Sequence, residues 1–390
     1  MVEELAEFAF TDEQGQLRSA VRRFCAENFD EQTVRRLQES DPPFDPKVWA
    51  RLGTELGVLG LSVSEADGGV GGNLVDQAIA VEEFGATLAC GPSFGTVFLA
   101  IPALVAAPAG AVRDGLLAEL VEGRRTAAFA VTDRAGAFDA SAVQVTASGG
   151  GQEWTLSGTV DQVVDAAAAD ELLVAATGPD GVSLFVVDAT AAGVRRTPLS
   201  TIDLTRPVAR VSLSDAPGRL LAGPDEADRV IGHALTVGSA LLAVEQVGGA
   251  QHMLDLAVQY AKERLQFGRP IGSFQAVKHR LADMLVDVEH ARSVAYHAVW
   301  ALSDGSDDPA LAASIAAATC SAAFSRVAAD AIQTLGGIGF TWEHQAHLYF
   351  KRATVDAALL GSAEQHRSRI ADLVLDTASD EKPPRVADGT

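Results

Sequence analysis

The chain has 390 residues, of which 48% are apolar and 21% are charged, so it is long and apolar enough to bury the cores of more than one domain. Lys and Arg number 30 against 52 Asp and Glu, and the formal charge of −22 argues against nucleic acid or an anionic membrane as a partner. This charge does not exclude an anionic ligand, which needs only a local cluster of basic side chains.

Cysteine content and the N-terminal residues bear on compartment. The first seven residues carry three glutamates, the wrong charge for a signal peptide, and no apolar run approaches the 18 residues of a membrane span.

His344 and His347 are close in sequence but form no H-E-x-x-H motif, so no metal site is expected. The cysteines are odd in number, far apart and without a Cys-x-x-Cys pair (Cys25, Cys90 and Cys320), which indicates a reducing, cytoplasmic protein without disulfides.

Residues 1–122 show helical periodicity and are predicted to form an N-terminal helical domain. Thr11 is placed to cap a helix whose apolar face carries Val21 and Phe24, and a second helix is expected around Trp49. The Gly-rich segment 67–73 follows no clear strand and is therefore predicted to be a loop, not a dinucleotide fingerprint.

Residues 123–222 change to short runs rich in β-branched and aromatic residues. Five such runs are predicted to be strands, at residues 129–131, 142–146, 154–156, 171–175 and 184–187. Glycine-containing segments 149–151 and 178–181 separate them as turns. This pattern predicts a small β-barrel or sandwich as the central domain.

Residues 223–376 return to helical periodicity. Four apolar-striped helices are expected, at about 225–265, 274–302, 309–335 and 363–375, and short joints between such helices favour a four-helix bundle. The polar residues 377–390 are predicted to be a disordered tail. The overall expectation is an α+β multidomain fold.

The joint between the first two of these helices is the most informative part of the chain. Gly and Pro alone would suffice for a turn, but this joint also contains Arg264, Gln266, Phe267 and Gln275. Planar donors beside an aromatic face suit a flat ligand that carries phosphate groups.

The layout and several motifs together resemble the acyl-CoA dehydrogenase family. Residues 264–275, RLQFGRPIGSFQ, resemble the segment that links two bundle helices in that family, and residues 333–340, QTLGGIGF, resemble its second flavin segment. Residues 49–72 and 82–85 resemble its N-terminal region, and the similarity spans about residues 5–376. The resemblance implies a flavoprotein that uses FAD for α,β-dehydrogenation of an acyl-CoA, with electron-transferring flavoprotein as the electron acceptor.

In this family the two segments hold the ADP end of FAD across a subunit interface, which implies an oligomer, usually a dimer of dimers. Arg264 would offer a charge-assisted fork to the diphosphate. Glycines would let the backbone approach the ligand closely. The residues implied by the resemblance are Arg264, Phe267, Phe274, Gln275, Gln333, Gly336 and Gly337.

The catalytic base of the family is missing from both of its usual positions. The chemistry needs a glutamate that removes the α-proton of the thioester. One family position for this glutamate corresponds to Leu360, and the other corresponds to Gly238, next to Ser239 where the family usually has an Arg. The small residues at 238 and 239 suggest extra room near the thioester and hence a bulky acyl group.

Glu245 lies two helical turns after Gly238 on an apolar stripe, where desolvation would suit a general base. The alternative is a structural carboxylate paired with a basic or polar side chain. Ser362 and Glu364 match family positions that contact the flavin, and Thr132 is the clearest match in the β-domain flavin stretch.

The chain keeps the residues that would hold the ADP end of FAD but lacks the base at both usual positions. This combination resembles the base-lacking subunit of actinobacterial heterotetrameric acyl-CoA dehydrogenases. Two functions of the chain therefore stay open besides dehydrogenation by an oligomer, whether a homo-oligomer or an α2β2 assembly. One is a catalytically silent subunit that completes the FAD site of a homologous partner. The other is a flavin monooxygenase on the same fold. The sequence does not distinguish a fatty, branched or sterol-derived acyl group.

Overall fold

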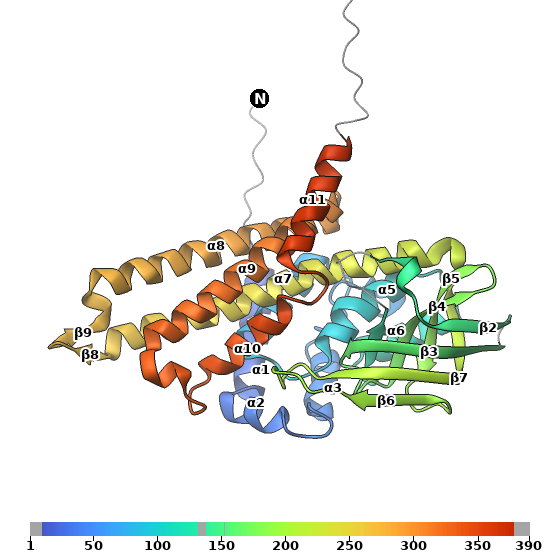
Figure 1. The fold of residues 1–390 in the computed structure, drawn as a ribbon, viewed down its shortest axis with the longest axis horizontal. Coiled ribbons are helices and arrows are strands. Elements are labelled where there is room, and N and C mark those ends of the chain that lie inside the picture. Colours follow the sequence, from blue (N-terminus) through green and yellow to red (C-terminus); the bar gives the residue numbers. More distant parts are fainter. Residues whose placement is uncertain (1–9, 132–137, 152, 378–390) are drawn as a thin grey trace, which may run out of the picture.

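The computed structural model describes residues 10–131, 138–151 and 153–377. A long helix, α7 (Pro224–Glu263), runs from the β-domain into the helical bundle, and the N-terminal helices lie below its middle in Figure 1. Helix α4 (Leu74–Thr87) of the N-terminal part, strand β5 (Gly181–Asp188) of the β-domain, and helices α8 (Gln275–Asp304) and α9 (Pro309–Leu335) of the bundle all pack on α7. This one helix therefore joins the three parts of the fold.

The N-terminal part is helical, as predicted. The first helix has the expected capping box, in which Thr11 and Gln14 each accept a hydrogen bond from the other's backbone N–H, at 3.2 and 3.1 Å. The elements are α1 (Asp12–Asn28), α2 (Glu31–Leu37), α3 (Pro46–Thr54), the 3-10 helix η1 (Glu65–Asp67), α4 (Leu74–Thr87), the π-helix η2 (Phe94–Ala100), α5 (Ile101–Ala106) and α6 (Ala111–Val121).

The central domain is a seven-stranded sheet in which six strands follow the order β1-β4-β2-β3-β7-β5 and the seventh, β6, pairs with β7. The sheet closes into a barrel because β5 also pairs with β4. Two of its strands, β6 and β7, were not predicted. Strand β7 contains Pro217 and Gly218, residues that usually indicate a turn, and it pairs with β3 through register shifts. The elements are β1 (Ala127–Ala130), the 3-10 helix η3 (Ala140–Ala142), β2 (Thr146–Gly150), β3 (Glu153–Val164), β4 (Glu171–Gly178), β5 (Gly181–Asp188), β6 (Val194–Pro198) and β7 (Val208–Ala222).

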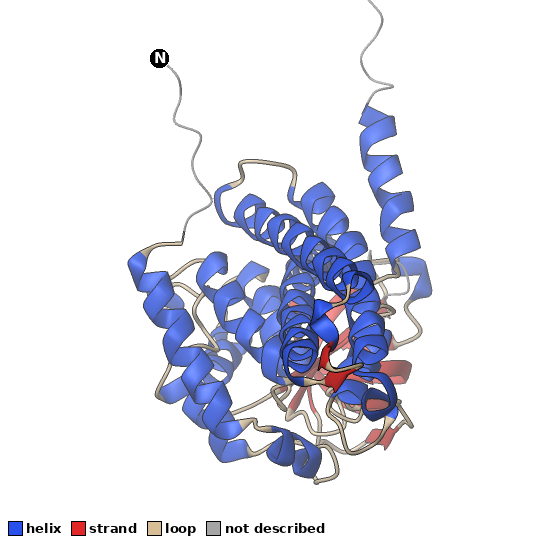
Figure 2. Ribbon diagram, turned by 90° about the vertical axis from the view of Figure 1, so that its left-hand side faces the viewer, coloured by secondary structure: helices blue, strands red, loops and turns tan. Residues whose placement is uncertain are grey.

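The bundle contains one helix more than expected, because α10 was not predicted. Viewed from the end of the bundle, the long helices pack side by side with the strands behind them, and α11 stands away from the rest (Figure 2). The elements after α7 are the hairpin β8 (Leu265–Gln266) and β9 (Arg269–Pro270), η4 (Ile271–Ser273), α8 (Gln275–Asp304), α9 (Pro309–Leu335), η5 (Gly336–Phe340), α10 (Ala346–Asp356) and α11 (Ala363–Thr377).

Helices α4 and α7 cross in direct backbone contact. A Cβ atom added at Gly85 would lie 2.0 Å from the carbonyl oxygen of Glu245, and one added at Gly248 would lie 2.0 Å from that of Glu82. Only glycine allows so close an approach, so these two glycines fix how α7 sits against the N-terminal helices.

Two helical segments, Pro224–Glu263 and Pro309–Phe340, are long and apolar enough to cross a membrane by length and composition alone. In α7, 83% of the apolar window is buried inside the fold. This is the burial expected of the core helix of a bundle.

Candidate functional site

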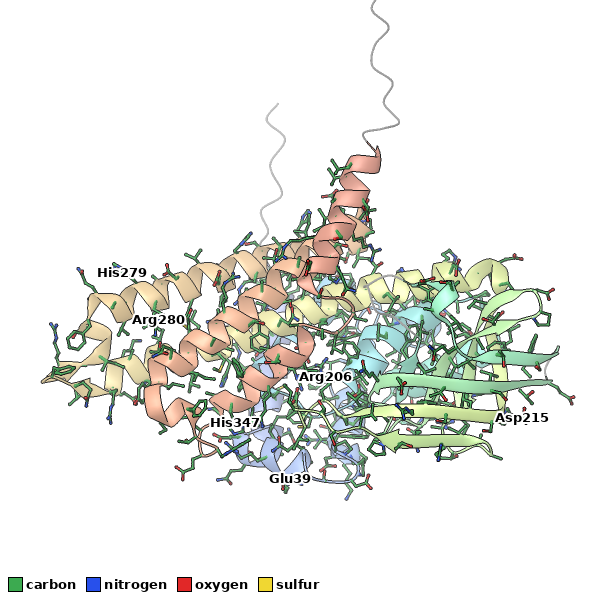
Figure 3. The ribbon with its side chains drawn as sticks, in the orientation of Figure 1. Glu39, Arg206, Asp215, His279, Arg280 and His347 are labelled. Carbon is green, nitrogen blue, oxygen red and sulfur yellow. The ribbon has the colours of Figure 1, made fainter. Side chains whose placement is uncertain are left out.

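The β8–β9 hairpin stands at the far end of the bundle from the β-domain (Figure 1). Phe267 at its tip has a backbone φ of +52° and a side chain that is 90% exposed. Segment 333–340 lies at the same end, because α8 and α9 run antiparallel, and an ion pair of 3.5 Å joins Arg280 to Asp330. Figure 3 shows His279 and Arg280 near this end. The two segments singled out in the sequence are therefore brought together.

Aromatic and guanidinium groups gather around the hairpin. The rings of Phe267 and Phe274 meet edge to face, with centroids 6.1 Å apart, and the guanidinium of Arg269 lies 4.2 Å from the Phe274 centroid. Within the part of the chain that the structure describes, no carboxylate lies within ion-pair distance of Arg264. Its charge is thus available for an anion from outside the chain.

The glycines of the second segment leave open space. Gly336 ends α9 with a φ of +67°, a conformation that favours glycine, whereas a Cβ atom at Gly337 would meet nothing within 4 Å. No packing within this chain therefore requires glycine at position 337. A ligand that approaches the backbone would require it. The exposed Gln333 and Gln275 lie beside these glycines and the hairpin respectively.

Large apolar side chains lie uncovered at this end of the bundle. Phe340 is 85% exposed and Trp342 is 72% exposed, and Leu265 and Phe267 are exposed on the hairpin. We call these four residues the hairpin-end surface. Large exposed apolar side chains often mark an interaction site, so this surface is suited to being covered in an assembly.

A second feature is a cleft of about 940 Å³ between the β-domain and the helices. Its mouth is polar, and Asp161 is its one carboxylate among the described residues, paired with Arg210. Its floor is apolar, and Val131 and Val164 contribute from the β-domain. The main floor residues are Phe94, Leu99, Phe129, Leu235, Leu359 and Leu360.

Gly238 and Leu360, the two positions at which the resemblance leads us to expect a base, lie side by side, and Leu360 lines the floor of this cleft. A Cβ atom added at Gly238 would lie 3.3 Å from the Leu360 side chain and only 2.5 Å from that of Leu99. Leu99 therefore fills the space above Gly238, and the expectation that small residues leave extra room there is wrong. Apolar side chains occupy the place where a carboxylate would act.

Leu360 is held in this place by its backbone. Its φ is +53°, and the next residue, Gly361, has a φ of +104°. The ring nitrogen Nε2 of the buried His366 lies 2.9 Å from the carbonyl oxygen of Leu360 and fixes the turn from the side of α11. This turn presents the side chain of Leu360 to the floor of the cleft.

Glu245 lies outside the cleft, in a buried ion-pair network. One of its oxygens lies 2.5 Å from Arg206 Nη2, and the other lies 3.2 Å from Arg352 Nη1. Both oxygens are occupied, and the carboxylate does not line the cleft. This placement favours the structural alternative and does not support Glu245 as the base.

The remaining predicted residues have local roles or lie outside the described part of the chain. Ser239 donates a hydrogen bond of 2.8 Å to the carbonyl oxygen of Leu235, one turn back on α7. Ser362 caps α11 by accepting from the Gln365 N–H at 3.3 Å, and Glu364 is exposed. Neither Ser362 nor Glu364 lines the cleft. Thr132 and the tail 378–390 lie outside the described residues.

The sequence gives little indication of the residues that shape the cleft floor and the ion-pair network. Phe94 and Leu99 lie on the π-helix η2, an unusual helix that is frequent at functional sites. Arg206 lies in an irregular connection, and Arg352 lies on the unpredicted α10. No periodicity marks these positions, although a buried glutamate on an apolar stripe does require a basic partner.

Comparison with known proteins identifies the family. The acyl-CoA dehydrogenase N-terminal domain matches residues 11–124, and the acyl-CoA dehydrogenase C-terminal domain matches residues 229–375. The chain belongs to the acyl-CoA dehydrogenase family. Among curated acyl-CoA dehydrogenases, IpdE2 of Mycolicibacterium smegmatis is 33% identical over 360 residues, which cover 92% of this chain and 98% of that protein.

Solved structures of acyl-CoA dehydrogenases share the fold. A Tcur3481–Tcur3483 steroid ACAD variant superposes with a TM-score of 0.84 at 32% identity, over 94% of this chain and 99% of that chain. The ChsE4–ChsE5 complex of Mycobacterium tuberculosis gives a TM-score of 0.84 at 29% identity, over 97% of this chain and the whole of that chain. The resemblance found in the sequence, and the fold it implies, are confirmed.

Proposed function

We propose that this chain is a subunit of an FAD-dependent acyl-CoA dehydrogenase assembly, in which it holds the ADP end of FAD and a homologous partner subunit supplies the catalytic base. The observation that carries this proposal is that neither family position for the base holds a residue that can accept a proton. Gly238 is covered by Leu99, and the other position is Leu360.

The hairpin end supports the other half of the proposal. Arg264 carries a charge that no carboxylate of the described chain neutralises, and Gly337 leaves its backbone accessible. These features fit a diphosphate, and the surrounding hairpin-end surface fits a subunit that closes over it. When bound, FAD would accept the hydride from the β-carbon of the acyl group. Electron-transferring flavoprotein is the proposed acceptor of those electrons.

Two of the solved relatives are named as two-component proteins, the Tcur3481–Tcur3483 enzyme and the ChsE4–ChsE5 complex. This supports an unlike partner for the present chain. A homo-oligomer would repeat the same apolar floor in every subunit and would contain no base at either family position.

The test is to purify the chain alone and together with a homologous subunit that carries the missing glutamate. We expect flavin and dehydrogenase activity only in the mixed assembly, assayed with fatty, branched and sterol-side-chain acyl-CoA thioesters. Stoichiometric flavin with dehydrogenase activity in the lone chain would overturn the proposal. Oxygen consumption by the reduced flavin would instead indicate the monooxygenase alternative.

A matched pair of variants tests the FAD contact within the mixed assembly. Arg264→Ala should weaken FAD retention about 10- to 100-fold, because a charge-assisted hydrogen bond contributes about 1.5–3 kcal/mol. Arg195 is an exposed arginine of β6, in the β-domain, so Arg195→Ala is the control and should leave FAD retention unchanged. Equal loss in both variants would show that the effect is not local to the hairpin.

A further inference from the structure

Beneath the cleft, at the junction of the β-domain and the helices, lies a buried cluster of six charged residues. Three come from the β-domain and three from α7 and α10, and each is 5% exposed or less. Arg206 marks the place at the centre of the molecule (Figure 3). The six residues, which we call the junction cluster, are Asp165, Asp203, Arg206, Glu245, Arg352 and Asp356.

The junction cluster contains more acids than bases. Four carboxyl groups face two guanidinium groups, so full ionisation would bury a net charge of −2. An uncompensated charge inside a protein is costly, and a buried carboxyl group avoids this cost by keeping its proton. The composition of the cluster alone therefore calls for two bound protons.

Hydrogen bonding shows which carboxylates are paired with the arginines. Asp203 lies 2.6 Å from Arg352 Nε, and Glu245 is bound by both arginines. Asp356 is not paired in this way. Both of its oxygens lack hydrogen-bond partners among the described residues, and Arg206 Nη1 lies 3.6 Å away.

Asp165 is the fourth acid, and among the described residues no guanidinium lies within ion-pair distance of it. Its carboxylate accepts a hydrogen bond of 2.8 Å from the backbone N–H of Gly95, at the start of the π-helix. Burial raises the pKa of Asp165 to about 6 and that of Asp356 to about 7. Arg206, Arg352 and Glu245 face both carboxyls, and Asp203 also faces Asp356.

The same two segments carry the junction cluster and line the cleft. The connection 199–207 contributes Asp203 and Arg206 to the cluster, and its residues 199–201 line the cleft. Helix α10 contributes two cluster residues, and Thr354 and Val355 between them line the cleft. The guanidinium of Arg206 also lies 5.0 Å from the centroid of the Phe94 ring on the cleft floor.

We propose that the junction cluster is a proton-controlled latch that holds the 199–207 connection of the β-domain against α10 and so controls the opening of the cleft. With protons on Asp165 and Asp356 the cluster is balanced and the cleft walls stay together. When both protons are lost, the net charge of −2 favours hydration and separation of the two segments. The device depends on neither FAD nor a partner subunit.

The sign of the pH effect follows from Asp165 and Asp356, the two acids that accept no hydrogen bond from a guanidinium group of the described chain. Their pKa values in the folded protein lie above the ordinary aspartate value, so their protons stabilise the closed junction at low pH. This stabilisation is lost as the pH rises through about 6 to 7. The latch therefore weakens as the pH rises towards neutrality, and the loss is complete above about pH 7.

Hydrogen exchange of the full-length chain at pH 5.5, 7 and 8.5, corrected for intrinsic exchange rates, tests the latch. Across this range, protection of residues 199–207 should fall at least about ten-fold more than protection of strand β4. The reason is that each pH unit over which an acid titrates changes the equilibrium between the closed and open junction up to ten-fold. An equal change in both segments would overturn the proposal.

Amide variants identify the responsible groups. Asp356→Asn, or Asp165→Asn as an independent second variant, should reduce the excess pH response of residues 199–207 below that of the wild type, because one of the two titrating groups is gone. Asp180→Asn, in the exposed turn between β4 and β5, is the control and should respond like the wild type. A wild-type response in both junction variants would refute the assignment.

Discussion

Replacing Asp356 by asparagine should stabilise the folded chain, and the gain should grow with pH. The amide has nearly the same shape as the carboxyl group but cannot ionise. Asp356 is 1% exposed, and neither of its oxygens has a hydrogen-bond partner among the described residues. In the wild type, ionisation at high pH therefore places a charge in the interior that no hydrogen bond compensates.

The magnitude follows from the pKa of the carboxyl group, which burial raises from 3.8 to about 7. Between these values the folded chain binds a proton that the unfolded chain has released, so wild-type stability falls as the pH rises. From pH 5 to pH 7 this amounts to about 3 kcal/mol at 1.36 kcal/mol per pH unit. Asp356→Asn cannot ionise at this position, so its free energy of unfolding does not fall in this way.

Urea denaturation of wild type and Asp356→Asn at pH 5 and pH 8 measures the effect. The free energy of unfolding of the variant, minus that of the wild type, should be about 3 kcal/mol more positive at pH 8 than at pH 5, with unchanged m-values. A difference that is the same at both pH values would refute the reasoning. A variant less stable than the wild type at pH 8 would show that the carboxylate is stabilising.

Three further predictions concern packing, pairing and the hairpin end. Gly238→Ala should lower the free energy of unfolding by about 1–3 kcal/mol, because the added methyl group collides with Leu99. Leu99→Ala in the same chain should remove that collision, so a double-mutant cycle measured by urea denaturation should give a coupling energy of similar size. Glu245→Gln should lower the free energy of unfolding by about 3 kcal/mol, because two buried guanidinium groups lose a partner. The specific activity of the folded assembly should be retained. Loss of activity with unchanged stability would instead support Glu245 as the base. Phe340→Ser should weaken subunit association in sedimentation experiments but change monomer stability by less than about 0.5 kcal/mol, since the side chain is exposed; unchanged association would exclude it from the interface.

The sequence by itself determined the local features and the family of this protein. The cap at Thr11 depends on residues three positions apart, and the long helices depend on a period of 3.6 residues, so both could be predicted from short windows. Segment 264–275 indicated a ligand-holding joint because its donors, aromatic rings and glycines are contiguous in the chain. The structure places them together on one exposed hairpin.

Only the tertiary structure decided what surrounds the buried carboxylates and the residues Gly238 and Leu360. Leu99 lies nearly 140 positions from Gly238 in sequence, yet a Cβ atom on the glycine would meet its side chain at 2.5 Å. Glu245 looked solitary along α7, because its two arginines come from the 199–207 connection and from α10. Contacts between distant segments leave no periodic signal in any one of them. The catalytic reading of Glu245 therefore lost support only when the β-domain and α10 were seen to close around it.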